Sequence, residues 1–394
     1  MDDANDARQR LRAASDPALV ATIRAEIALA GCITFARFMA LALYHPAHGY
    51  YLAARERPGR GGDFLTAPEL TPFFGHCLMR QLRQVWEALG QPKAFTILEY
   101  GAGGGRLAHD LLTAARTEAP DFAARIRYLL RETNPHRRAA ARELLDRAAL
   151  GARAAFADDE QDRSPPFVGA IVSNEFVDAL PIHRVVGGAD GDLLERYVRW
   201  DERADWFAEE VAPPSTPRLA AALAAAGVTL AAGQSGEINL AADEWLAAAA
   251  ARLARGVLLT IDYGYQSAEL YSPRRREGTF LCYHRHTALD DPYVRLGAQD
   301  MTAHVDFGAL DRAGQRLGLA SLGFSTQGIF LGNLGLGDLL VATQRPDRAL
   351  DDYLADRTAV LTLIDPRRMG RFGVLAQGKA FAPPAPLRGF APLR

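Results

Sequence analysis

The sequence predicts an α/β protein built on a doubly wound sheet, with a helical segment before the sheet and an insertion within it. Three observations predict this class. Before residue 95, apolar positions recur at helical spacing. From Phe95 onward, short apolar runs alternate with helical segments, which is typical of a parallel sheet covered by helices on both faces. A glycine-rich turn follows the first of these runs, and such sheets bind ligands beyond the carboxyl ends of their strands.

Residues 1–94 are expected to form a helical N-terminal cap. The run DPALVATIRAEIALAG has the helical spacing of apolar residues, and FGHCLMRQLRQVWEALG repeats it until Gly90 and Pro92 end the helix.

Residues 95–182 are expected to form the first half of the sheet. Four apolar runs predict strands, and a helix is predicted after each of the first two; the second helix has proline in its first turn, which that position tolerates. In chain order these elements are FTILEY, Arg106–Arg116, IRYLLRE, Pro135–Leu150, RAAF and FVGAIVS.

Residues 183–255 are expected to form an insertion, and residues 256–394 the second half of the core. In the insertion, HRVVGGADGDLLERYVRW predicts a hairpin around a Gly/Asp turn, and Ala241–Ala254 predicts a helix. The second half is expected to contain further strands and one helix-like segment. In chain order these are GVLLTIDYG, FLCYHRH, the helix-like HVDFGALDRAGQRLG, LASLGFSTQGIFL and RFGVLAQGK.

The composition of the 394 residues is that of an ordinary globular protein, with 49% hydrophobic and 23% charged residues. A net charge of −2 gives no electrostatic reason to expect nucleic acid or an anionic membrane as a partner. The three cysteines are scattered, so neither a disulfide framework nor a structural zinc site is expected. The acidic N-terminus MDDANDARQR has no apolar core segment and no apolar run is long enough to span a membrane, which predicts a cytoplasmic protein.

The stretch ILEYGAGGGRLA places Glu99 just before Gly101, Gly103 and Gly105. Glycine there permits positive φ and lets a ligand approach the backbone. The stretch fits both the GxGxxA dinucleotide pattern and the ExGxGxG loop of S-adenosylmethionine (SAM) methyltransferases. A diphosphate is disfavoured near a carboxylate, whereas SAM carries a sulfonium and an amino group. Glu99 therefore favours SAM, with an NAD-dependent oxidoreductase as the alternative.

Glu132 ends the second predicted strand, where an acid can accept hydrogen bonds from ribose hydroxyls. A solvated glutamate at a strand end is the alternative.

Polar side chains also follow the fourth predicted strand, at Asn174, Glu175 and Asp178. Because the two acids are three residues apart, one helical turn would aim them the same way. Two carboxylates could hold a guanidinium, orient its nitrogen and accept its proton, and Asn174 could bind a substrate amide or amine. Helix capping is the alternative role of all three residues.

Six blocks of the sequence resemble the MidA family of SAM-dependent methyltransferases, in the family's order and from about residue 25 to residue 380. They are ITFARFMALALYHPAHGYY, GDFLTAPELTPFFG, ILEYGAGGGRL, SNEFVDALPIHRV, LLTIDYGY and GAQDMTAHVDFGAL. The chain departs from the family at GAGGG, where GPGRG is more usual, and at RETNP, where VEVSP is common and the acid is retained. The resemblance implies a doubly wound, seven-stranded, Rossmann-like class I methyltransferase sheet.

The resemblance also implies the cofactor, the site and the partner. SAM would be bound by Glu99, the three glycines and Glu132, and Asn174 and Glu175 would face the substrate. The N-terminal segment would cap the pocket through Phe64, Thr66, Pro68 and Glu69. Because mitochondrial members act in complex I assembly and are implicated in symmetric arginine dimethylation, the expected substrate is a protein arginine, with a respiratory complex I subunit as a candidate. An assembly chaperone with a structural or vestigial SAM site and a small-molecule methyltransferase are the alternatives.

Histidines elsewhere are expected to have structural roles. His45 and His48 are expected to pack within the cap, and His304 and Asp306 to start a helix, so no metal site is predicted.

Overall fold

The computed structural model describes residues 2–52, 65–157, 165–346 and 348–392. The chain forms two compact units. The first comprises Met1–Phe64, Asp178–Glu244 and Tyr265–Ala309, and the second comprises Leu65–Val177, Trp245–Gly264 and Leu310–Arg394. These boundaries differ from the predicted ones in two main ways. Residues 65–94, expected in the cap, group with the sheet, because their helix α5 (Phe73–Ala88) packs along α6 (Arg106–Glu118). Residues 265–309, expected in the second half of the core, group with the first unit.

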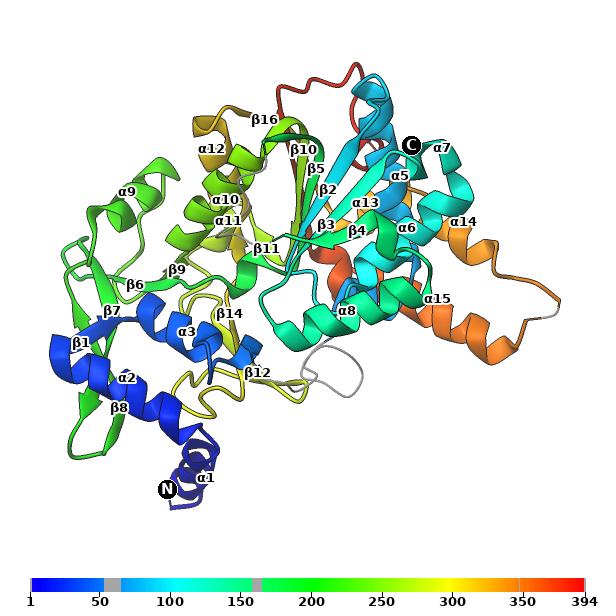
Figure 1. Ribbon diagram of the computed structural model, residues 1–394. Helices are drawn as coiled ribbons and strands as arrows, with labels where there is room; N and C mark the ends of the chain where they lie inside the picture. The colour runs from blue at the N-terminus through cyan, green and yellow to red at the C-terminus, as the bar shows by residue number, and fades with distance from the viewer. Residues whose placement is uncertain (1, 53–64, 158–164, 347, 393–394) are drawn as a thin grey trace. The chain divides into compact units, whose positions relative to one another are not determined.

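The second unit is built on a seven-stranded mixed sheet in the order β16-β17-β10-β5-β2-β3-β4 (Figure 1). The five strands from β10 to β4 pair in parallel, and β17 runs antiparallel to both of its neighbours. The strands are β2 (Phe95–Tyr100), β3 (Ile126–Arg131), β4 (Ala154–Phe156), β5 (Phe167–Asn174), β10 (Leu253–Asp262), β16 (Leu319–Thr326) and β17 (Gly373–Lys379). An α/β fold is thereby confirmed, with a mixed sheet.

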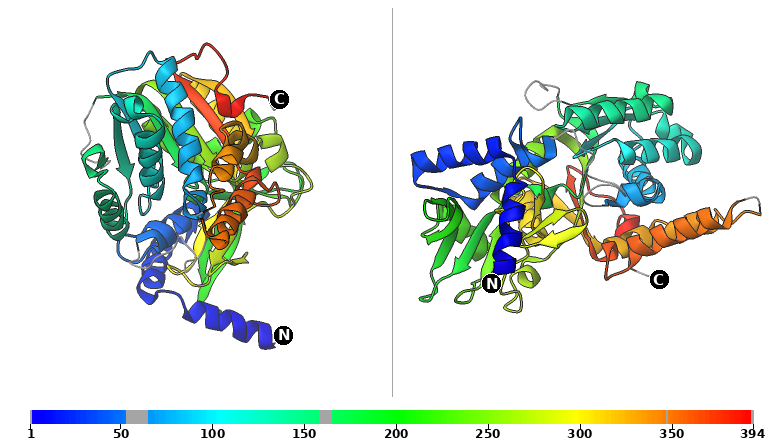
Figure 2. Two further views of the ribbon diagram at one scale, coloured as in Figure 1. Left: turned by 90° about the vertical axis from the view of Figure 1, so that its right-hand side faces the viewer. Right: turned by 90° about the horizontal axis from the view of Figure 1, so that it is seen from below.

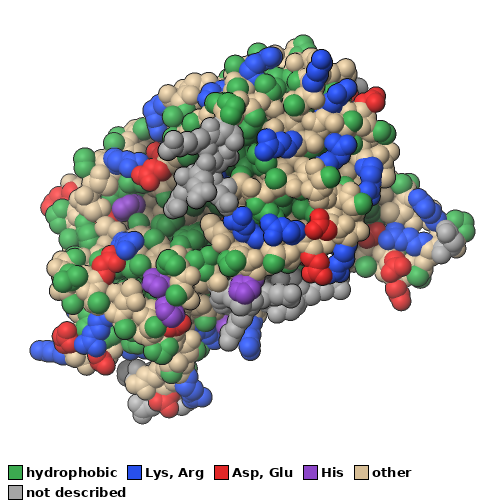
Figure 3. All heavy atoms as spheres, in the orientation of Figure 1, with side chains coloured by type: hydrophobic (Ala, Val, Ile, Leu, Met, Phe, Trp, Pro, Cys, Tyr) green, Lys and Arg blue, Asp and Glu red, His purple; other side chains and the backbone are tan. Residues whose placement is uncertain are grey.

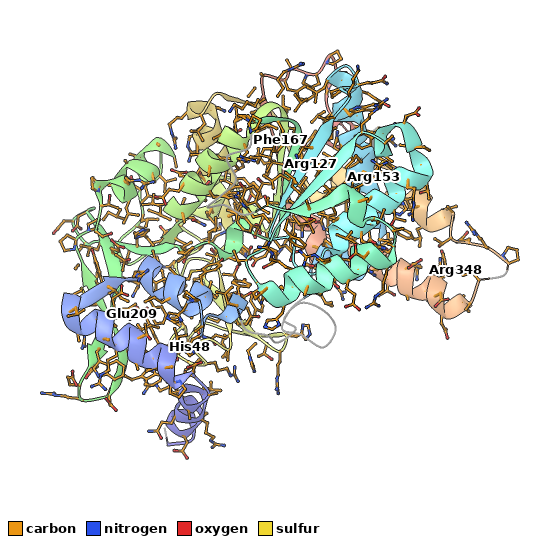
Figure 4. The ribbon with its side chains drawn as sticks, in the orientation of Figure 1. His48, Arg127, Arg153, Phe167, Glu209 and Arg348 are labelled. Atoms are coloured by element: carbon orange, nitrogen blue, oxygen red, sulfur yellow. The ribbon has the colours of Figure 1, made fainter. Side chains whose placement is uncertain are left out.

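The order of the strands fixes where a ligand can enter. β2 lies between β3 and β5, so the chain leaves β2 toward one side of the sheet and later returns to its other side. Connections that diverge in this way leave a crevice at the carboxyl ends of the strands. Figure 4 labels Arg127, Arg153 and Phe167 at the opposite edge, where β3, β4 and β5 begin.

The side chains of β2 alternate between two layers. Phe95 and Ile97 belong to the apolar core formed with α5 and α6, whereas the Tyr100 ring meets Trp245 of α10 (Leu240–Arg252). The remaining helices and turns of the unit are α4 (Ala67–Leu70), α7 (Pro120–Ala123), α8 (Pro135–Arg147), η2 (Gly151–Arg153), α13 (Gln327–Asn333), α14 (Leu336–Val341), α15 (Leu350–Ile364), η4 (Met369–Arg371) and η5 (Arg388–Phe390).

Several segments of the second half differ from the sequence prediction. The strand expected over FLCYHRH belongs to a three-stranded sheet of the first unit and not to the seven-stranded sheet. The strand expected over LASLGFSTQGIFL ends at Thr326, and its second half is the helix α13. Helix α15, which contacts α14 (Figure 2), was not predicted. Its apolar residues occupy two faces: Val360 and Leu363 are buried, whereas Leu350 is 69% exposed. No single apolar stripe therefore marks this helix in the sequence.

The first unit contains the predicted hairpin, formed by β6 and β7 and extended by three further strands into a five-stranded sheet. Its elements are α1 (Asp2–Ala13), α2 (Pro17–Ala30), β1 (Cys32–Thr34), α3 (Phe35–Tyr44), η1 (Tyr50–Leu52), β6 (His183–Gly187), β7 (Leu193–Asp201), β8 (Trp206–Ala212), α9 (Pro217–Ala225), β9 (Ser235–Ile238), α11 (Ser267–Leu270), β12 (Leu281–His284), β13 (Thr287–Leu289) and β14 (Asp300–Thr302). Four of the described elements have residues in both units: η3 (Val177–Ala179), α10, β11 (Gly264–Tyr265) and α12 (Phe307–Arg316). The short strand β15 (Val305–Asp306) directly precedes α12.

The histidine segments make structural contacts in this unit, but His304 does not start a helix as expected, because the short strand Val305–Asp306 lies between it and α12. The Nδ1 atom of His45 accepts the backbone N–H of His48, and His48 pairs with Asp16. The Asp306 carboxylate accepts the N–H of Ala309, which caps the start of α12. Within the described residues, no helix combines the length and apolar character needed to cross a bilayer. Charged side chains of both signs appear on the face drawn in Figure 3.

Candidate active site

The glycine turn between β2 and α6 has the backbone that the sequence predicted. Gly101, Gly103 and Gly105 have φ values of 68°, 54° and 77°, which residues with a side chain adopt only at a cost. Gly105 caps α6 in the left-handed conformation, and a Cβ there would lie 2.8 Å from the Cβ of Ala141. At this position glycine is required by both conformation and packing.

The middle of the turn faces open space. A Cβ built on Gly103 or Gly104 would meet no heavy atom within 4 Å, whereas one on Gly101 would lie 3.0 Å from the Phe176 ring. The backbone of Gly103 and Gly104 is therefore accessible to a ligand at the edge of the sheet where ligands bind. This is the geometry that a nucleoside-binding turn needs.

The Glu132 carboxylate is fixed against this turn by two backbone groups. Its Oε2 accepts the N–H of Gly103 at 2.9 Å, and its Oε1 accepts the N–H of Asn134 at 2.8 Å. Asn134 in turn caps α8 by accepting the N–H of His136. A carboxylate oxygen has two lone pairs, so this carboxylate keeps acceptor capacity for hydroxyl groups of a ligand. The residues present thus fit a SAM ribose beside the turn.

Glu99 lies in the core beneath the turn, where burial works against ionisation of its carboxyl group. The side chain is 4% exposed, and the Tyr128 hydroxyl donates a hydrogen bond to Oε2 at 2.8 Å. Burial raises the pKa of Glu99 to about 8; the bond from Tyr128 opposes this rise, and the charge of Glu132 adds to it. Burial therefore favours the neutral carboxyl group when no cation is nearby.

Asn174 ends β5, and Glu175 follows it and contacts the backbone of Ala67. The Asn174 Nδ2 donates to Glu175 Oε1 at 3.1 Å, and the backbone N–H of Ala67 donates to the same oxygen at 3.0 Å. Glu175 has a φ of 48°, which is uncommon for a residue with a side chain. The Oδ1 of Asn174 is buried without a hydrogen-bond partner among the described residues. Buried carbonyl oxygens usually have a partner, so a ligand is a candidate for this role.

The residues expected to cap the pocket, Phe64, Thr66, Pro68 and Glu69, differ in their surroundings. Thr66 precedes α4 and makes no side-chain capping bond. Pro68 is buried and Glu69 is exposed, whereas Phe64 lies outside the described residues.

Asp178 does not share a helical turn with Glu175, and this expectation was wrong. The 3-10 turn η3 begins only at Val177, because Glu175 takes the left-handed conformation. Asp178 belongs to the first unit and is 6% exposed, and its Oδ2 accepts the Thr302 hydroxyl at 2.8 Å. This contact gives Asp178 a structural role within its own unit.

Asp262, at the carboxyl end of β10, was not predicted as a site residue. Asp262 is fully buried, and its Oδ2 accepts the N–H groups of Phe176 at 3.2 Å and Val177 at 3.0 Å. A signal was present in LLTIDYGY, where an acid directly ends an apolar run, as Glu99 does near the end of FTILEY. The described residues contain no group of three or more side chains suited to hold a metal ion.

The chain resembles methyltransferases in both sequence and structure. Residues 77–325 match the family described as "Putative S-adenosyl-L-methionine-dependent methyltransferase". A crystal structure from Burkholderia thailandensis bound to S-adenosyl-homocysteine is 37% identical, with a TM-score of 0.86, and the match covers 95% of this chain and 94% of that one. A second structure from the same organism, solved in native form, matches with a TM-score of 0.83 and the same identity and coverage.

Curated relatives carry a more specific name. "Protein arginine methyltransferase NDUFAF7 homolog, mitochondrial" from Drosophila melanogaster is 27% identical over 91% of this chain and 84% of its own length. The Homo sapiens protein named "Protein arginine methyltransferase NDUFAF7, mitochondrial" is 29% identical over 78% of this chain and 70% of its own length. These relatives are named as mitochondrial proteins, which contradicts the prediction of a cytoplasmic protein.

Proposed function

The chain belongs to this family of S-adenosyl-L-methionine-dependent methyltransferases, and on that premise we propose that its methyl acceptor is an arginine side chain of a protein. SAM is the methyl donor. The proposed acceptor is supported by the relatives that are named protein arginine methyltransferases. From the resemblance given above, we extend the proposal to a respiratory complex I subunit as the substrate protein. We also propose that the sheet is the doubly wound, Rossmann-like sheet of class I methyltransferases.

The proposed cofactor cradle consists of the glycine turn and Glu132. The exposed backbone of Gly103 and Gly104 would lie against the nucleoside, and the fixed Glu132 carboxylate would accept the ribose hydroxyls. When bound, SAM supplies a methyl group on a sulfonium, which needs no further activation. Thr66 and Asn174 remain in the proposal as residues that line this cradle, and Glu99 remains as the carboxyl group beneath it.

The observation that carries the arginine proposal is the pair of acceptor groups after β5. The Glu175 carboxylate lies beside the Asn174 side chain, whose Nδ2 donates to Glu175 Oε1, and the Asn174 Oδ1 has no hydrogen-bond partner among the described residues. A guanidinium presents several N–H donors in one plane. These oxygens would hold the guanidinium so that one nitrogen faces the methyl group. As the N–C bond forms and the S–C bond breaks, that nitrogen loses a proton, which the Glu175 carboxylate is suited to accept. Asp178 has no part in this proposal because it binds Thr302.

The test is methyl transfer from SAM with a tritiated methyl group into an extract of source cells that lack the protein. Labelled protein is hydrolysed to amino acids and separated by chromatography. We expect tritium in methylated arginine with the wild-type enzyme and a strong loss with Glu175→Gln, which keeps the size of the side chain and removes its charge. Tritium in another amino acid, or only in small molecules, would reject the arginine proposal.

A further inference from the structure

Three successive backbone N–H groups after β5 all bind to the carboxyl end of β10. The N–H of Glu175 donates to the Ile261 carbonyl at 2.9 Å, and the next two N–H groups donate to Asp262 Oδ2. The other oxygen, Oδ1, accepts the N–H of Tyr263 at 2.9 Å. One fully buried carboxylate thus holds two segments that are 85 or more residues apart in the chain.

The contacts of the Asp262 carboxylate, called the anchor below, help to fix the unusual conformation of Glu175. A non-glycine residue keeps a positive φ only when its surroundings fix it, because the left-handed conformation is unfavourable in itself. Here the N–H of Glu175 is bound to β10, and the two residues after it are bound to Asp262. Without Asp262, the segment would be free to relax to a more common conformation. Such a change would turn the Glu175 side chain away from Asn174.

We infer that Asp262 is a positioning residue for methyl transfer, which acts by holding the Glu175 carboxylate in the orientation that meets the acceptor nitrogen. This inference rests on the proposed function, since it takes Glu175 as the carboxylate on the acceptor side. A carboxylate suits this role because both of its oxygens only accept hydrogen bonds. Asparagine has the same shape, but its NH₂ group would face the backbone N–H of Tyr263 or the N–H groups of Phe176 and Val177, and it cannot accept a hydrogen bond from any of them.

The variant Asp262→Asn tests the inference with three measurements. These are the rate of tritium transfer at saturating SAM, the dissociation constant of SAM by calorimetry, and hydrogen exchange at the amides of Phe176 and Val177. Misplacing a reacting group by about 1 Å costs on the order of 100-fold in rate, so we expect a loss of at least about tenfold. We expect the SAM dissociation constant to stay within about twofold, because the glycine turn and Glu132 are untouched.

A double variant separates positioning from general destabilisation. In the Glu175→Gln background, Asp262→Asn should cost little further rate, since both changes disable the same group. The matched control is Gln377→Met. Like Asp262, Gln377 is fully buried in this unit, and its side chain donates a hydrogen bond to the Leu310 carbonyl. It pairs with Leu258 of β10, four residues before Asp262. This control should keep both the rate and the exchange at Phe176 and Val177. Fully additive losses in the double variant would overturn the inference.

The outcomes distinguish this inference from the proposed function. If wild-type enzyme labels no arginine, the proposed function fails, and exchange at Phe176 and Val177 still tests the anchor. If Asp262→Asn keeps wild-type rate and exchange, the inference fails and arginine methylation stands. Should the variant not fold, wild-type exchange decides: the amides of Phe176 and Val177 must be as protected as those of β10, and fast exchange overturns the inference.

Discussion

Replacing Glu99 by glutamine should make the stability of the protein less dependent on pH. Burial raises the pKa of Glu99 from an ordinary 4.5 to about 8, so the folded protein binds this proton more tightly than the unfolded chain. The contribution of Glu99 to the free energy of unfolding of the wild type therefore falls as pH rises from 4.5 to 8. Glutamine can accept the Tyr128 hydrogen bond through its carbonyl oxygen, but it does not ionise.

The size of the effect follows from the shift. About three and a half pKa units at about 1.4 kcal/mol each correspond to about 5 kcal/mol. The stability of Glu99→Gln relative to wild type should thus rise by up to about 5 kcal/mol across this window and change little above pH 9. Removing the hydrogen bond with Tyr128→Phe should raise the pKa of Glu99 in the folded protein further and extend the upper end of the window to higher pH, because that bond favours the ionised form.

Urea unfolding without cofactor, at pH 5, 7 and 9, measures the difference between Glu99→Gln and wild type. The transition can be followed by the fluorescence of Trp86 and Trp245, which both lie in the unit that contains Glu99. A difference that stays constant from pH 5 to pH 9 would refute the reasoning, because Glu99 would then ionise alike in the folded and unfolded protein.

Three further predictions concern the cofactor cradle. Glu132→Ala should weaken SAM binding at least about tenfold by calorimetry, because hydrogen bonds to charged groups contribute about 1.5–3 kcal/mol; an unchanged dissociation constant would contradict the proposed role of Glu132. Gly105→Ala should destabilise the protein by about 1–3 kcal/mol in thermal unfolding, because its φ is 77° and its new Cβ would meet Ala141. Gly104→Ala is the matched control and should keep the stability but lose SAM affinity, because its Cβ would enter the cradle. SAM binding at pH 7 should release part of a proton in the wild type and none in Glu99→Gln, because a nearby cation favours the ionised form of the Glu99 carboxyl group. Calorimetry in buffers of different ionisation enthalpy measures the number of protons released. Equal release by both proteins would exclude Glu99 as the source.

Local patterns predicted the parts of the site that depend on neighbouring residues in the chain. The three glycines have positive φ because a strand, a tight turn and a helix follow one another within ILEYGAGGGRLA. Glu132 could be located because it ends the next strand of the same parallel sheet, and parallel strands present their carboxyl ends at one edge.

Contacts between distant residues determine what the sequence could not predict. The charge state of Glu99 depends on burial and on Tyr128, which lies on the neighbouring strand. The conformation of Glu175 depends on Asp262, 87 residues later, and this conformation is also why Asp178 does not share its turn. Such pairings appear only when the strands are assembled.

The two hydrogen bonds of Glu132 have a consequence for how the cradle responds to its ligand. The same carboxylate ties the glycine turn to the first residues of α8, so the two walls of the cradle share a single joint. A ligand that hydrogen-bonds to the Glu132 carboxylate therefore affects the glycine turn and the start of α8 together. Ligand binding should therefore change the mobility of the first residues of α8 as well as that of the glycines, including residues that do not contact the ligand.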